Sequence, residues 1–127
     1  MPCAERRRSV RYAVKRCTAL FRRRRWIFFW EKEPHHAPIV DLSSHGIGFY
    51  TTRTLHPGDI IRIAFDMPYE LYAIPPGFEV KAEVRWNNPA AHGEPGLRRV
   101  GCAFHRLKPE QHDLIVRIIR FGVLRQQ

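Results

Sequence analysis

Two short polar segments carry the side chains that could recognise a ligand. The first, RRSVR, is marked by two arginines four positions apart, Arg7 and Arg11. The second, DLSSHG, has the pattern D-x-S-x-x-G, formed by Asp41, Ser43 and Gly46. An aspartate can accept two hydrogen bonds from the Watson–Crick edge of guanine, and an arginine can bind a phosphate bidentately or stack on a purine. A partner that carries both guanine and phosphate would use every one of these groups.

The second segment has two interpretations. If it is an extended strand, Asp41 and Ser43 point to the same face, about 7 Å apart on the barrel exterior. Gly46 then permits a strained backbone or the close approach of a ligand. The alternative is a plain Asx or Ser turn that leads into a strand. The arginines at the other segment favour the ligand-binding interpretation.

Enzymatic chemistry is not indicated by the sequence. Ser43, Ser44 and His45 are adjacent, but a nucleophile needs a base brought to it in space with an orienting group behind it. The seven histidines are scattered and lack the spacing of a metal site. No glycine-rich phosphate loop precedes a helix. We therefore expect no catalytic residues, no metal ligands and no cofactor.

Positive charge is concentrated at the N-terminus. Residues 1–25 contain ten Lys and Arg against one acidic residue, which gives +9 of the total +10. The remaining residues contain twelve basic and eleven acidic side chains, which gives +1. An anionic partner at the N-terminal end is therefore expected.

The elements that must position these groups are mainly strands. We predict one domain over residues 1–127, with a mobile basic arm over 1–10, an antiparallel β-barrel over 11–107 and a helix over 109–121. Pro109 suits the first helical position and Gly122 a C-terminal cap. An apolar stripe on this helix is expected to pack on the barrel: Leu114, Ile115, Ile118 and Ile119.

The clearest strand is FEVKAEVRW. Its alternation predicts five side chains that face the core: Phe78, Val80, Ala82, Val84 and Trp86.

A basic and aromatic segment, RRRRWIFFW, has two interpretations. It is either one strand with a basic lead-in or a functional surface. In the second case Trp26, Phe28 and Trp30 share a face that engages RNA, DNA or an acidic membrane.

The compartment is expected to be the cytoplasm. The three cysteines show no CxxC spacing, which favours reduced thiols. No apolar run approaches the ~18 residues of a membrane span, and no signal peptide is recognisable.

The two polar segments, in this order, resemble those of the PilZ domain family, the bacterial receptor module for the second messenger cyclic di-GMP. That family carries an R-x-x-x-R arm ahead of the barrel and, later in the chain, a (D/N)-x-S-x-x-G motif on a strand. LHPGDIIRIAF and RRVGCAFHRL are similar to later strands of the family, so the resemblance covers about residues 5–120. The sequence departs from the family in the long basic and aromatic segment over 22–36.

The resemblance implies a non-enzymatic cyclic di-GMP receptor or adaptor, acting in motility or biofilm regulation. Arg7 and Arg11 would wrap over the ligand, contacting phosphates and the Hoogsteen edge of guanine. Asp41 and Ser43 would hold the base and the adjacent phosphate, and Gly46 would shape the turn. Two further arginines would assist, in this family often with a stacked pair of ligand molecules: Arg6 and Arg8.

By this resemblance, ligand binding would order the arm over the barrel and change the surface offered to an effector protein. Two alternatives stay open. One is a general nucleic-acid or polyanion-binding module that uses the basic arm. The other is a PilZ-like adaptor that no longer binds the nucleotide.

Overall fold

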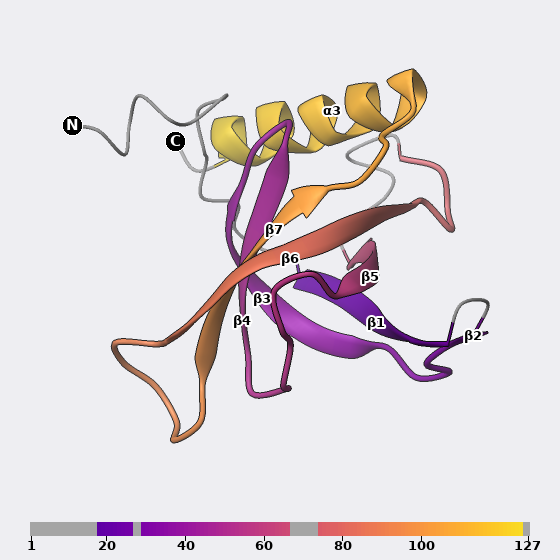
Figure 1. Ribbon diagram of the computed structural model, residues 1–127. Coiled ribbons are helices and arrows are strands. Elements are labelled where there is room, and N and C mark those ends of the chain that lie inside the picture. Colours follow the sequence, from indigo (N-terminus) through magenta and orange to yellow (C-terminus); the bar gives the residue numbers. More distant parts are fainter. Residues whose placement is uncertain (1–17, 27–28, 67–73, 126–127) are drawn as a thin grey trace.

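An antiparallel β-barrel with one helix forms the described part of the chain (Figure 1). The computed structural model describes residues 18–26, 29–66 and 74–125. Six strands follow one another around the barrel, and the last pairs back with the first. In spatial order they are β1 (Thr18–Trp26), β3 (His35–Leu42), β4 (Gly46–Thr51), β7 (Arg98–Phe104), β6 (Glu79–Pro89) and β5 (Ile60–Asp66). This confirms the predicted mainly-β barrel with a C-terminal helix.

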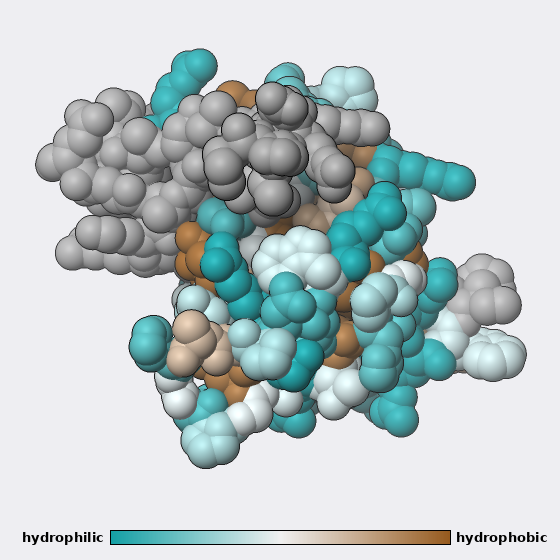
Figure 2. All heavy atoms as spheres, turned by 60° about the vertical axis from the view of Figure 1, so that its left-hand side comes forward, coloured by the Kyte–Doolittle hydropathy of each residue, from teal (hydrophilic) through white to brown (hydrophobic). Residues whose placement is uncertain are grey.

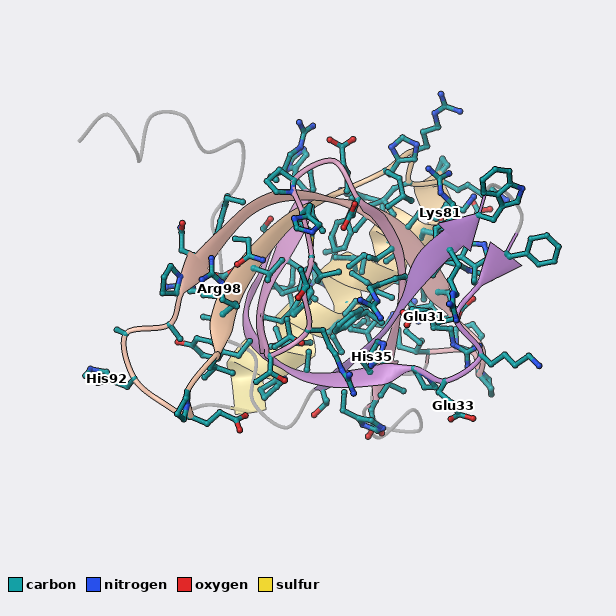
Figure 3. The ribbon with its side chains drawn as sticks, turned by 60° about the horizontal axis from the view of Figure 1, so that its bottom comes forward. Glu31, Glu33, His35, Lys81, His92 and Arg98 are labelled. Atoms are coloured by element: carbon teal, nitrogen blue, oxygen red, sulfur yellow. The ribbon has the colours of Figure 1, made fainter. Side chains whose placement is uncertain are left out.

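Helix α3 (Pro109–Arg125) lies across one end of the barrel. Figure 3, which looks towards the opposite end, shows the helix behind the strands. Ile115 and Ile118 are fully buried in the same core as the inward side chains of the strands, and Leu114 packs at its edge. The apolar stripe therefore packs on the barrel as predicted, and water is kept out of this end of the core.

The predicted end of the helix is wrong by four residues. The helix was expected over 109–121, with Gly122 as its cap, but it continues through Gly122 to Arg125. A glycine ends a helix when the chain adopts the left-handed conformation there, whereas inside a helix it costs only about 1 kcal/mol.

The basic and aromatic segment is a hairpin and not a single strand. β1 ends at Trp26, and the two-residue strand β2 (Phe29–Trp30) pairs back onto it, with Trp26 opposite Phe29. Trp30 follows Phe29 along the strand and points to the opposite face, so Trp26 and Trp30 do not share a face and the prediction is wrong for them. Phe28 lies outside the described residues. Figure 1 shows this hairpin at the edge of the barrel.

Strands β3 and β6 each contain a β-bulge that reverses their in-and-out alternation. In β3 the register shifts between Ile39 and Asp41, and in β6 it shifts between Val84 and Trp86. Val80, Ala82 and Val84 face the core as predicted. Trp86 does not, because the extra residue before it turns its side chain outward.

The surface is largely polar where Figure 2 shows it. Described residues on this face are mainly hydrophilic, with hydrophobic ones visible only as separate patches between them (Figure 2). The large buried side chains are those of the inward strand positions and the helix, such as Phe21, Phe49 and Ile118.

Candidate ligand-binding site

A row of four residues crosses the outside of the barrel from β3 to β6. Asp41 pairs with Gly48 of β4, Gly48 pairs with Gly101 of β7, and Gly101 pairs with Trp86 of β6. The neighbours of the two glycines along their strands are core residues, so the glycines themselves lie on the outer face. Directly paired residues share a face, and Asp41 and Trp86 are therefore outward too. We call these four residues the outward row.

The two large side chains of the outward row lie over the two glycines. A Cβ atom at Gly48 would be 2.8 Å from Asp41 Oδ1, and one at Gly101 would overlap the indole ring of Trp86. Both positions therefore require glycine for space. The result is a carboxylate at one end and an aromatic ring at the other, separated only by backbone.

Arg99 joins the two ends of the outward row. Its Nη2 donates to Asp41 Oδ2 at 3.2 Å, and its guanidinium carbon is 6.0 Å from the centre of the Trp86 ring. The Arg99 side chain is still 43 % exposed, and its buried Nε has no hydrogen-bond partner among the described residues. The Arg99 guanidinium, with one N–H donor unused, thus lies between the Asp41 carboxylate and the Trp86 ring. This arrangement suits an anionic ligand that also carries an aromatic base.

Sequence reasoning missed Arg99, Gly48 and Gly101, and it assigned Trp86 to the core. A signal was available in the glycines. Gly48 in GIGF and Gly101 in VGCA each occupy the outward position between two core residues, where almost any side chain would otherwise be allowed.

Ser43 lies in the turn after β3, and not on the strand beside Asp41. Its amide donates to the Gly46 carbonyl at 2.9 Å. Its Oγ accepts hydrogen bonds from the amides of His45 and Gly46 at 3.2 and 3.1 Å. The same hydroxyl donates to the Gly46 carbonyl oxygen at 3.4 Å. The residue is only 2 % exposed. The interpretation as an extended strand with Asp41 and Ser43 on one face is therefore wrong, because this hydroxyl closes the β3–β4 turn.

Gly46 is required by a neighbouring strand. It pairs with Ala103, and a Cβ atom at Gly46 would overlap the carbonyl oxygen of Cys102 on β7. The Phe104 amide also donates to the His45 carbonyl at 2.8 Å. The D-x-S-x-x-G motif thus fixes the turn against β7, which holds Asp41 beside Arg99.

The predicted arginines lie outside the described residues: Arg6, Arg7, Arg8 and Arg11. The entry of the chain into the barrel is described, however. Thr18 pairs with Pro38 and Phe21 with His35, so the chain enters β1 from the side of the barrel at which β3 reaches Asp41. Six residues lie between Arg11 and Thr18 in the sequence.

A second polar cluster lies near the other end of β1, at the base of the β1–β2 hairpin. Glu31 accepts from Arg23 through both carboxylate oxygens, at 2.9 and 2.8 Å, and also from the Arg23 amide at 2.7 Å. His35 Nε2 lies 3.0 Å from Glu31 Oε2. Figure 3 shows Glu31 and His35 together, with Glu33 apart from them. The hydrogen bonds from Arg23 lower the pKa of Glu31 to about 2.

No group of three or more His, Cys, Asp or Glu side chains in the described ranges is arranged to hold a metal ion. No helix within those ranges is long and apolar enough to cross a membrane.

Comparison with solved structures places this barrel among known folds. The PilZ domain of YcgR from Escherichia coli with c-di-GMP is similar at a TM-score of 0.72 and 17 % identity, over 95 % of this chain and 94 % of that one. The MrkH–c-di-GMP complex of K. pneumonia is similar at a TM-score of 0.68 and 17 % identity, over 95 % and 54 % of the two chains. The Bacillus subtilis inhibitor of motility MotI/DgrA follows at a TM-score of 0.64 and 17 % identity, over 95 % and 51 %. The chain thus spans about half the length of the last two.

No curated protein matches the sequence. The PilZ domain family matches residues 5–121, which include both polar segments, all the strands and most of the helix. With the barrel, the helix and the D-x-S-x-x-G turn in place, the chain belongs to the PilZ domain family.

Proposed function

We propose that this chain is a non-enzymatic receptor for cyclic di-GMP, which binds on the outward row. The observation that carries the proposal is the arrangement of Asp41, Arg99 and Trp86 over two glycines. It offers an acceptor for a guanine edge, a cation for a phosphate and a ring for stacking. Membership of the PilZ family supports the same ligand, as do the solved YcgR and MrkH complexes with c-di-GMP.

Some of these residues contact the ligand, and others support the turn that positions them. Asp41 accepts from the Watson–Crick edge of guanine, and Trp86 presents its ring to a base. Arg99, which pairs with Asp41 before the ligand arrives, donates to a phosphate. Ser43 and Gly46 act by holding the turn, because the Ser43 hydroxyl is buried and engaged within it.

The basic arm supplies the remaining contacts. Arg7 and Arg11 close over the nucleotide and bind its phosphates and the Hoogsteen edge, assisted by Arg6 and Arg8. Hydrogen bonds to charged groups contribute about 1.5–3 kcal/mol each, while ordering the arm costs about 1–2 kcal/mol per residue. The difference between these contributions predicts a dissociation constant near the micromolar range, which corresponds to a binding free energy of about −8 kcal/mol. Ordering the arm changes the surface that an effector protein contacts, which is how the signal leaves the domain.

The test is calorimetric titration of the full chain with cyclic di-GMP at physiological salt. We expect binding by the wild type and at least tenfold weaker binding by Asp41→Ala and by Arg11→Ala. Asp113→Ala is the matched control, since its side chain is 81 % exposed on helix α3, and it should bind like the wild type.

Two results would favour the alternatives. A general polyanion-binding module would be indicated if the affinity is unchanged in Asp41→Ala, falls steeply with salt concentration and is equal for other polyanions. No heat with the wild type would indicate an adaptor without the nucleotide.

A further inference from the structure

The β1–β2 hairpin carries two large aromatic side chains that the barrel does not cover. Trp26 and Phe29 are 66 % and 65 % exposed, and they are the large hydrophobic residues exposed on the described surface. They are direct cross-strand partners, so their rings lie on the same face of the hairpin. We call this pair the hairpin tip. An exposed apolar pair of this size is unusual on a soluble surface and indicates an interaction site.

The hairpin is anchored at its base by hydrogen bonds between Glu31 and Arg23. The Glu31 carboxylate accepts from the side chain and amide of Arg23, and the Glu31 amide donates to the Arg23 carbonyl at 3.0 Å. Trp30 turns back towards the barrel, where the Arg62 guanidinium carbon is 5.3 Å from its ring centre. Arg62 is itself held by Glu79 at 2.6 Å. The hairpin tip is therefore presented by fixed neighbours.

Positive charge surrounds the hairpin tip. Residues 22–33 contain five basic and two acidic side chains, a net charge of +3. One of the two acids, Glu31, is already engaged by Arg23 and His35. Arg24 and Arg25, directly before Trp26, are exposed, and no carboxylate of the described residues lies within ion-pair distance of them. The partner that matches this charge is anionic.

We infer that the hairpin tip is a docking surface for an anionic lipid bilayer. Aromatic rings favour the interfacial region of a membrane, and arginines beside them attract acidic headgroups. Single-stranded nucleic acid is less well matched, because it stacks successive bases on platforms spaced along a basic groove. Here the rings are one cross-strand pair at the end of a hairpin. The outward row lies on β3, β4, β7 and β6, so membrane and nucleotide can be bound together.

The experiment is co-sedimentation of the full chain with two kinds of vesicle. One contains phosphatidylcholine alone and the other contains phosphatidylcholine with phosphatidylglycerol. We expect binding to the anionic vesicles and at least tenfold weaker partitioning to the neutral ones. Trp26→Ala with Phe29→Ala should weaken partitioning into the anionic vesicles roughly tenfold, and Arg24→Ala with Arg25→Ala by a similar factor.

Two controls separate the hairpin from the basic arm. Arg120→Ala removes a charge from an exposed position of helix α3 and should change partitioning less than twofold. Quenching by brominated acyl chains reports ring insertion directly, and it should fall sharply in Trp26→Ala while Trp30 and Trp86 remain.

Three results would overturn the inference. The first is unchanged vesicle binding by the double aromatic variant, which would assign the binding to the arm. The second is absence of quenching in the wild type. The third is preferential binding of single-stranded nucleic acid that depends on Trp26. Each variant should keep its calorimetric response to cyclic di-GMP, so failure of this inference is distinguishable from failure of the proposed function.

Discussion

Replacing Glu31 by glutamine tests how the hairpin is attached to the barrel. The Glu31 side chain is 13 % exposed and accepts hydrogen bonds from the Arg23 side chain and amide. These bonds lower the pKa of Glu31 from the ordinary 4.5 to about 2. At about 1.4 kcal/mol for each tenfold change in proton affinity, this corresponds to roughly 3 kcal/mol of stability at neutral pH. Because the Arg23 side chain is 37 % exposed, water screens part of this, and we expect about 2 kcal/mol.

The pH dependence has a definite sign. A carboxyl group whose pKa is lower in the folded state stabilises that state fully above its unfolded pKa of 4.5. The stabilisation is lost as the pH falls towards about 2, since the proton then binds in both states. Glu31→Gln should therefore lower the free energy of unfolding by about 2 kcal/mol at neutral pH and progressively less in acid.

Urea denaturation of the wild type and the variant at several pH values measures this difference. Glu33→Gln is the matched control, because Glu33 is an exposed neighbour on the same segment and should change stability by less than about 0.5 kcal/mol. An equal loss at neutral and acidic pH would refute the reasoning, since it would show that Glu31 acts through its shape and not its charge. A neutral-pH loss no larger than that of the control would refute it as well.

Three other substitutions test the turn and the outward row. Ser43→Ala should lower the free energy of unfolding by about 1–2 kcal/mol in thermal or urea denaturation, because the backbone amides of His45 and Gly46 lose their hydrogen-bond acceptor. Ser44→Ala should be nearly neutral. Gly101→Ala should displace the Trp86 ring, lower the free energy of unfolding by about 1–3 kcal/mol and weaken cyclic di-GMP binding. A crystal structure of the variant with an unmoved ring would contradict this. Arg99→Met keeps the side-chain stem but removes the cation, so we expect about tenfold weaker binding by calorimetry, with unfolding little changed.

The regular strands and the helix could be predicted because their side chains repeat with the period of the element. Val80, Ala82 and Val84 alternate as a half-buried strand requires, and Ile115 and Ile118 recur on one helical face. In each case burial of one face determines which residues are apolar, and that information is local to the segment.

The bulges in β3 and β6 could not be predicted in this way. A bulge adds one residue to one strand, and it is visible only against the partner strand. In β6 the apolar alternation continues unbroken through Val84 to Trp86, yet the bulge between them turns Trp86 outward. In β3 the bulge after Ile39 likewise determines that Asp41 is outward. The motif identified Asp41 as a site residue. Its partners Arg99 and Trp86 could not be identified, because they lie on β7 and β6, which are distant from Asp41 in sequence.

The central claim is that cyclic di-GMP binds on the outward row, and an NMR titration tests it most directly. The chain has three tryptophans, which give three indole N–H signals: Trp26, Trp30 and Trp86. Saturation with cyclic di-GMP should shift the Trp86 indole and the amides of Gly48 and Gly101, while the indoles of Trp26 and Trp30 stay in place. An unmoved Trp86 signal at saturation, or a shift confined to the hairpin tryptophans, would contradict the proposed site.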